Sequence, residues 1–288
     1  MKLRRIKAVQ AEEPAHVINR RKRRRRRILR AVRSLLVTAL FAFTIVYAAL
    51  SPCFNIKEIK VVGETRYDAA ELAAASGIRT GRNGFRVLFS SESITGFFRI
   101  GDAEKAIIEK CPYVRSAEVR YIIPGTVRIS VTEREPVAII ELKGIPLLID
   151  KDGYLLEVDP ELDTERGKNE LPVIRTADPG SAVPGKKLDI PEEMLLSAFK
   201  VFDTIREADA MNDVKLLPLV DYVDTSDLSN IRFSLESRII VNLGRVDELF
   251  YKINAAASIF TKNIKINERG TLDFSVGKDP VFTPESGG

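Results

Sequence analysis

Residues 34–56 contain no charged side chain, and they lie shortly after a block in which every residue is basic. A helix needs about 20 mostly apolar residues to cross the hydrocarbon core of a bilayer. The segment reaches that length from Ile28, because Arg30 and Arg33 can extend their charged ends into the headgroup region. We therefore predict a single transmembrane helix over residues 28–53, preceded by a disordered basic cytoplasmic tail over residues 1–27.

The basic block sets the expected orientation of that helix. Lys and Arg next to a membrane span are retained in the cytoplasm, and the flank after the span, with Lys57, Glu58 and Lys60, has no comparable excess. We predict a single-pass type II membrane protein, with most of its chain outside the cytoplasm. The residues assigned this topology-determining role are Arg20, Arg21, Lys22, Arg23, Arg24, Arg25, Arg26 and Arg27.

Other interpretations of this region remain open. A cleaved signal peptide also begins with basic residues, but its apolar core is only about 7–15 residues long; Ala48, Ala49 and Ser51 leave a cleavage site open. A lipoprotein would use Cys53, although Pro52 stands where a small residue is expected. Nucleic-acid binding by the arginine block is not needed, because topology and attraction to anionic lipids already account for the charge.

Charge and rare residues exclude several kinds of chemistry. Residues 1–33 hold fourteen Lys or Arg against two Glu, a balance of +12, so with a total of +5 the remaining residues carry −7. The exported part is therefore mildly acidic and lacks the basic footprint of nucleic-acid binding. The single histidine, His16, lies in the basic leader, which excludes catalytic schemes that need an exported histidine. We expect the two cysteines, Cys53 and Cys111, to be unpaired thiols.

The first exported module, over residues 54–133, is expected in the order β-α-α-β-β. A β-rich run over residues 56–62 is followed by Asp68 and Glu71, a capping box that opens a helix. A second helix is expected over residues 100–110, and two alternating strands flank Pro124-Gly125. Two helices on one face of a small sheet make a compact domain.

The second module, over residues 134–278, is expected to be mostly β, so the fold class is α+β. Asp150 to Gly153 form a hairpin turn rather than a calcium loop, because the first ligand position would fall on Leu148, which has no side-chain oxygen. The expected later elements are helices over 190–207 and 246–262, a last strand over 271–276 and a flexible tail over 279–288.

Segments in both modules form a set that is specific in its order along the chain. They are residues 59–65, 111–120, 124–127 and 131–138 in the first module, and residues 149–153, 171–174, 242–244, Lys252 and residues 270–273 in the second. Together they resemble the FtsQ/DivIB family of bacterial cell-division proteins. Two departures are a longer loop over residues 82–100 and a shorter C-terminal tail than in some Gram-positive members. The resemblance implies a transmembrane helix, a POTRA domain over residues 54–133 and then a β domain.

The resemblance also implies a function. It is that of a non-catalytic bitopic scaffold of the divisome, located at the division septum, that helps to control septal peptidoglycan synthesis. The implied partners are small coiled-coil membrane proteins of the FtsB/DivIC and FtsL type. Because the sequence shows no nucleophile–base pair, metal cluster or phosphate loop, we expect no enzyme activity and no cofactor. Alternatives are a POTRA-containing export or assembly chaperone of the envelope, and an enzyme of wall metabolism.

In the family that the chain resembles, the partner adds a strand alongside the final strand. Carried over by resemblance, the partner-binding residues are Leu272, Phe274, Ser275, Val276 and Lys278. Since no later strand is predicted, we expect residues 271–276 to form a free sheet edge. Strand alternation gives Phe274 a competing place in the core, and a purely structural last strand is the alternative. The strand over residues 56–62 is a second possible docking surface.

Overall fold

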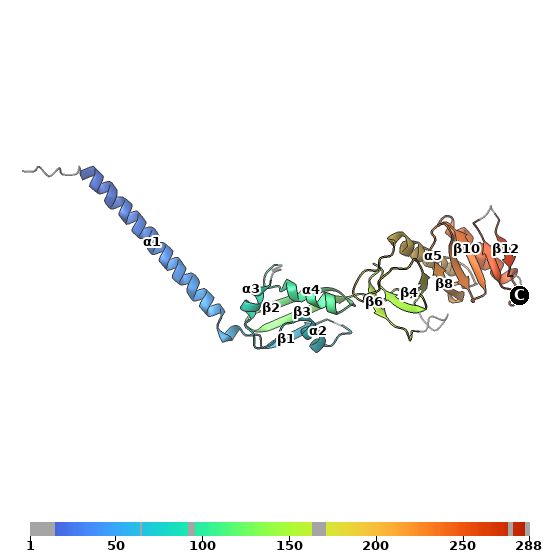
Figure 1. The fold of residues 1–288 in the computed structure, drawn as a ribbon, viewed down its shortest axis with the longest axis horizontal. Helices are drawn as coiled ribbons and strands as arrows, with labels where there is room; N and C mark the ends of the chain where they lie inside the picture. The colour runs from blue at the N-terminus through green and yellow to red at the C-terminus, as the bar shows by residue number, and fades with distance from the viewer. Residues whose placement is uncertain (1–14, 64, 92–95, 163–170, 276–278, 286–288) are drawn as a thin grey trace, which may run out of the picture.

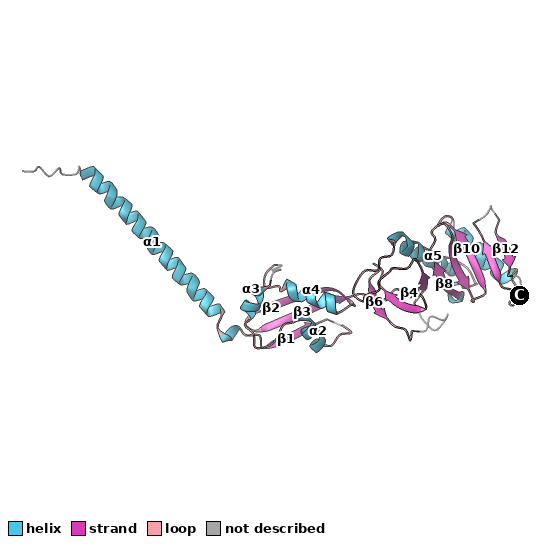
Figure 2. Cartoon of the chain, in the orientation of Figure 1, coloured by secondary structure: helices cyan, strands magenta, loops and turns pink. Residues whose placement is uncertain are grey.

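The computed structural model describes residues 15–63, 65–91, 96–162, 171–275 and 279–285. A long helix, a small module and a larger sheet-rich module follow one another along the molecule (Figure 1). Figure 2 shows strands in both modules, with the shorter helices beside them. The chain is thus an α+β protein with an N-terminal apolar helix, as expected from the sequence.

The N-terminal helix α1 spans Ala15–Ala49. Among the described residues it is the one helix long and apolar enough to cross a membrane, over Arg25–Ala49, and the rest of the chain buries none of that part. The predicted disorder of residues 1–27 is therefore wrong for residues 15–27, which continue the helix. Lys and Arg are good helix formers, and extending an existing helix adds one hydrogen bond for each residue that is fixed.

The first module combines a three-stranded sheet with three short helices. Its sheet has the order β1-β3-β2, in which β3 pairs parallel with β1 and antiparallel with β2. The expected capping box of Asp68 and Glu71 is confirmed, and Gly77 ends that helix at a φ of 70°. The elements are η1 Pro52–Phe54, β1 Glu58–Val62, α2 Ala69–Ser76, α3 Gly84–Ser90, α4 Gly101–Lys110, β2 Val114–Ile122 and β3 Thr126–Glu133.

The second module is built on a nine-stranded sheet with the order β12-β11-β10-β9-β8-β7-β4-β5-β6. Its strands are β4 Ala138–Leu142, β5 Ile145–Ile149, β6 Leu155–Val158, β7 Val173–Arg175, β8 Val220–Asp224, β9 Ile231–Leu235, β10 Ile239–Gly244, β11 Gly270–Asp273 and β12 Val281–Pro284. The remaining elements are α5 Glu192–Met211, η2 Leu217–Leu219 and α6 Leu249–Lys262.

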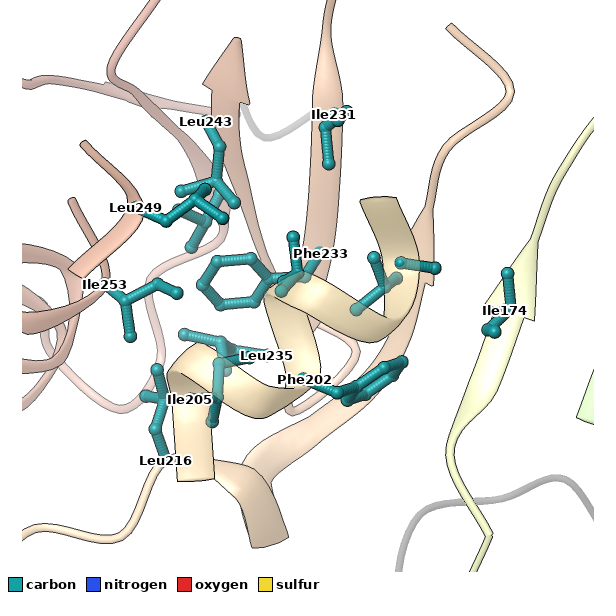
Figure 3. Packing of buried hydrophobic residues seen from close by; sticks show 14 of the residues in the cluster. Ile174, Phe202, Ile205, Leu216, Ile231, Phe233, Leu235, Leu243, Leu249 and Ile253 are labelled. Carbon is teal, nitrogen blue, oxygen red and sulfur yellow. The ribbon is translucent and has the colours of Figure 1, made fainter. Parts of the chain in front are cut away.

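The two long helices of this module bury their apolar stripes against one face of the sheet. Phe202 and Ile205 of α5 and Ile253 of α6 lie with Phe233 of β9 in a single cluster (Figure 3). The helix α5 begins after Pro191, and no side chain caps its first turn. On β9 and β11 the residues that alternate with the buried apolar ones are polar, namely Arg232, Ser234, Thr271 and Asp273.

Side-chain contacts join the two modules. The Tyr113 hydroxyl donates to the Glu157 carboxylate at 2.6 Å, and Arg115 pairs with Asp152 at 2.9 Å. Asp150 accepts hydrogen bonds from the backbone N–H groups of Asp152 and Tyr154, at 2.9 and 2.8 Å, which confirms the hairpin turn. The contact between the two modules, which we call the joint, therefore includes Asp152 of the predicted hairpin turn.

Candidate partner-binding edge of the β domain

One end of the large sheet is formed by β12, which pairs antiparallel with β11. The prediction of residues 271–276 as the last strand and the free edge is therefore wrong. The strand there, β11, is shorter than predicted. Both of its edges are paired, one with β10 and the other with β12. The predicted flexible tail over residues 279–288 contains the true edge strand. We call the side of β12 that faces away from β11 the outer edge.

Gly270 allows β12 to lie close to β11. A Cβ atom at this position would stand 2.3 Å from the Thr283 carbonyl oxygen and 2.9 Å from the Pro284 Cα atom. Real Cβ atoms do not approach backbone atoms so closely, so a larger residue would push β12 away. Gly270 thus has a packing role in holding the edge strand.

A single hydrogen bond shows which backbone groups form the outer edge. The Glu285 N–H donates to the Arg269 carbonyl at 2.8 Å. Because alternate residues of an antiparallel strand direct their backbone groups at the partner, Val281 and Thr283 also face β11 in this register. The backbone groups of Phe282 and Pro284 therefore face outward.

Proline limits what the outer edge can donate. Pro284 has no N–H, and neither has Pro280, which stands directly before the strand. Within β12, the outward groups are thus the N–H and carbonyl of Phe282 and the carbonyl of Pro284. Prolines at a sheet edge discourage indiscriminate strand pairing. This edge is suited to a short added strand that meets Phe282, and less suited to a long one.

The structure distributes the five predicted partner-binding residues over different environments. Leu272 is 1% exposed and Phe274 is 8% exposed, so both belong to the core. Ser275 is exposed, with its N–H and hydroxyl donating to the Asp273 carboxylate at 2.7 and 2.6 Å. Val276 and Lys278 lie outside the described residues. A partner-binding role for any of the five stays a prediction.

The residues that sequence reasoning missed are those of β12 itself. Val281 is 55% exposed, whereas Phe282 packs partly against the core of the second module. The triplet Val281-Phe282-Thr283 has the composition of a strand, but it is short and bounded by prolines. Those prolines made the segment look like a tail.

One surface hollow is lined by the edge strand, and a second lies beside Phe274 and the start of α6. On the helix-free face, a hollow of about 560 Å³ is lined by Arg238, Thr271 and Thr283, among others. On the helix face, a hollow of about 890 Å³ includes the exposed side chains of Phe250 and Tyr251. A partner that meets the outer edge would therefore also find apolar surface beside it.

Lys252 of α6 bonds to the end of β10, the third strand from this edge. Its buried ammonium donates to the Leu243 carbonyl at 2.8 Å and pairs with Asp247. The hydrogen bond from Lys252 lowers the pKa of the Asp247 carboxyl. The ammonium thus satisfies carbonyl groups at the end of β10 and holds the start of α6 against it.

The other predicted features are placed as follows. Arg25, Arg26 and Arg27 are exposed on α1, and the side chains of residues 20–24 are not described. Among the residues that the structure describes, the strand β1 has a neighbour on one side only, so it forms an edge of the small sheet. Ser197 and Lys200 have a Ser-x-x-Lys spacing, but Ser197 is buried and Lys200 is exposed, so they do not share an accessible site. Within the described residues, no group of three His, Cys, Asp or Glu side chains is arranged to hold a metal.

Comparison with known proteins relates both modules to proteins of one kind. A family model described as the POTRA domain, FtsQ-type, matches residues 54–134. The chain is similar to the cell division protein DivIB of Clostridium acetobutylicum, with 23% identity over 238 residues that cover 81% of this chain and 84% of the relative. For DivIB of Clostridium botulinum strain Loch Maree the identity is 24% over 262 residues, or 91% and 93% of the two chains. The cell division protein FtsQ of Koribacter versatilis is 31% identical over 147 residues, which cover 50% of this chain and 39% of the relative.

Proposed function

Because the chain belongs to the FtsQ/DivIB family of cell division proteins, we propose that it is a non-catalytic bitopic scaffold of the divisome. It is a membrane-anchored division protein. In this proposal the N-terminus lies in the cytoplasm and both modules lie outside it. The protein binds small coiled-coil partners of the FtsB/DivIC and FtsL type and, through them, helps to control septal peptidoglycan synthesis.

The observation that carries the partner-binding proposal is the one-sided pairing of β12 at the end of the nine-stranded sheet. A partner segment adds as a tenth strand, with main-chain hydrogen bonds supplying affinity. The added strand exchanges two hydrogen bonds with Phe282 and donates a third to the Pro284 carbonyl. The contact set proposed from the resemblance thus moves outward by one strand, from β11 to β12.

The surfaces beside the edge support a partner that is helical next to its added strand. The exposed Phe250 and Tyr251 rings line the larger hollow, on the face that α5 and α6 cover. Aromatic side chains are enriched in protein interfaces because each buries much area. A strand at β12 with a helix packed on this hollow would use both features of the site.

The division role is tested by imaging an N-terminal fluorescent fusion in the organism's own cells. A band at midcell in dividing cells supports the scaffold. An even signal around the envelope contradicts it and favours the export or assembly chaperone. The orientation is tested in parallel by labelling the exposed Cys53 with a membrane-impermeant maleimide in intact cells. Labelling of intact cells supports a cytoplasmic N-terminus, and labelling only after lysis contradicts it.

A further inference from the structure

The first module is fastened directly to the end of the membrane helix. The Asn83 side-chain amide donates to the carbonyl oxygens of Ala49 and Ser51, each at 3.1 Å. Its carbonyl oxygen accepts from the Arg86 N–H at 3.0 Å and so caps α3. One side chain therefore links the last turn of α1 to the first turn of α3, and α3 lies at the end of the first module nearest to α1 (Figure 1).

The length of α1 locates the membrane surface at this junction. Twenty-two residues from Ile28 to Ala49 span about 33 Å at about 1.5 Å per residue, which matches a hydrocarbon core of about 30 Å. With the arginine block at one headgroup layer, Ala49 reaches the other. Tyr47, 75% exposed near this end, has the position of an interfacial aromatic. The residues bonded to Asn83 thus lie at the outer surface of the bilayer.

Large aromatic side chains are exposed in the same region. Phe89, in the last turn of α3, is 71% exposed, and Phe97 is 89% exposed. They are held on a rigid base, because Phe85 contacts the rings of Phe54, Phe98 and Tyr121 at centroid distances of 5.1 to 6.1 Å. Exposed apolar surface that is contiguous and bordered by polar residues marks a site of contact with a protein or a membrane.

Exposed basic side chains lie near Phe89 along the chain, since Arg86 is one helical turn before it on α3 and Arg79 and Arg82 precede that helix. Arg79, Arg82 and Arg86 are all exposed, and the structure pairs none of them with a carboxylate of the described residues. Arginine side chains near a membrane are attracted to anionic headgroups, at about 1 kcal/mol for each residue close to the surface. Exposed aromatic rings bordered by basic groups are typical of surfaces that lie in the headgroup layer.

We propose that Phe89 and Phe97, with Arg82 and Arg86, form a membrane-facing patch that contacts the outer surface of the bilayer into which α1 is inserted. The occupant is an anionic lipid surface, because the patch is continuous with the membrane exit of α1 and carries the complementary charge. The rings enter the headgroup layer, and the guanidinium groups bind lipid phosphates. This contact fixes the orientation of the first module on the membrane. It rests on the membrane anchor and does not depend on partner binding at β12.

The chain contains no tryptophan, so Phe89→Trp introduces a single fluorescent reporter into the patch. The full chain is reconstituted in vesicles of mixed zwitterionic and anionic lipid, with and without a lipid brominated high on its acyl chain. We expect quenching of about half or more of that seen for Tyr47→Trp, which is the reference within the membrane helix. Tyr251→Trp on α6 is the matched control, since Tyr251 is also exposed, at 57%, but belongs to the second module.

The proposal is overturned if the brominated lipid quenches Tyr47→Trp but quenches Phe89→Trp no more than Tyr251→Trp. The patch would then be a surface for a protein partner. Circular dichroism checks that the variants are folded. Adding Arg82→Gln and Arg86→Gln to Phe89→Trp should reduce quenching in the anionic vesicles by about twofold or more, because two guanidinium contacts with lipid phosphates are lost. No reduction would overturn the lipid-charge part of the inference.

Discussion

The Arg134 guanidinium donates to the Asp150 carboxylate at 2.6 Å, and both side chains are more than nine-tenths buried, at 8% and 4% exposure. Arg134 directly follows the last strand of the first module, and Asp150 begins the hairpin turn of the second. The Arg134 guanidinium also lies over the Tyr154 ring, 3.7 Å from its centroid. A buried ion pair therefore lies where the two modules meet.

Replacing Arg134 by Met should destabilise the second module strongly. The substitution removes the counter-charge of Asp150 and leaves a buried carboxylate with two backbone N–H groups. Removing one partner of a buried pair costs about 3–5 kcal/mol, and we expect the lower end of that range because the two N–H bonds remain. Chemical unfolding of the full chain in detergent measures the change.

A surface ion pair provides the control for this prediction. Arg206 and Asp203 pair at 2.7 Å on α5, but they are 51% and 72% exposed. Arg206→Met should change the free energy of unfolding by about 1 kcal/mol or less. If the Arg134 and Arg206 variants unfold alike, the Arg134 pair does not stabilise the joint.

The Tyr113–Glu157 hydrogen bond should make the joint sensitive to alkaline pH. Burial, and then the hydrogen bond to Glu157, raise the pKa of Tyr113 from 10.0 to about 12. A pKa that is higher in the folded protein gives stability that is complete below the unfolded pKa and is lost above it. The part of the stability that is linked to Tyr113 should therefore be constant up to about pH 10 and fall between about pH 10 and 12.

Ultraviolet titration at the phenolate band follows this group, and Tyr113→Phe is the control. The wild-type chain should show one tyrosine that ionises near pH 12 and is missing in the variant. If the difference between the wild-type and Tyr113→Phe titrations instead showed a tyrosine that ionises near pH 10, Tyr113 would be exposed to water and not bonded to Glu157 in solution.

Asn83 offers a test of how the first module is attached to α1. Asn83→Asp keeps an oxygen that can cap α3 but loses the N–H groups that bond Ala49 and Ser51. We expect α3 to stay folded and the angle between α1 and the module to vary more widely. Spin labels at Val46→Cys and Arg128→Cys, with Cys53→Ser, would report this as a broader distance distribution.

Asn83→Ala removes both the cap and the two donated bonds. It should broaden the same distribution and also cost about 1 kcal/mol from loss of the cap. A distribution as narrow as that of wild type in both variants would mean that other contacts hold the module in place.

Gly270→Ala should dislodge the edge strand without changing its sequence. The new methyl group would meet the Thr283 carbonyl, and such overpacking costs about 1–3 kcal/mol. Hydrogen exchange should then accelerate at the Thr283 N–H, which faces β11, while the N–H groups bonded between β9 and β10 keep their protection. Unchanged exchange at Thr283 would contradict the close approach of these two strands.

The sequence predicted those parts of the fold that depend on local signals. The uncharged run predicted the membrane helix, although that helix ends at Ala49 and not at residue 53, and Asp68 with Glu71 identified the start of α2. Alternating apolar residues predicted β2 and β3, and Asp150 to Gly153 predicted the hairpin turn. In each case the residues that carry the signal are neighbours along the chain.

The outer edge could not be predicted in this way. Whether a strand is an edge depends on which other strand pairs with it, and β12 has only four residues between positions that look like loop. The close approach that admits β12 depends on Gly270, whose role is visible only when Thr283 is placed beside it. The start of α1 was misjudged for a related reason, since a polar sequence can continue a helix that its neighbours have formed.

The most direct test of strand addition at β12 compares the affinities of the Phe282→Pro and Phe282→Ala variants for the partner. Both variants lose the partly buried ring, but only proline removes the outward N–H, and neither change takes a hydrogen bond from β11. The dissociation constant of the full chain for the FtsB/DivIC-type partner of the same organism is measured for each, with melting temperatures as a check on folding. The account predicts that the Pro variant binds about tenfold or more weakly than the Ala variant, or about 1.4 kcal/mol. Equal affinities in two equally stable variants would contradict strand addition at β12.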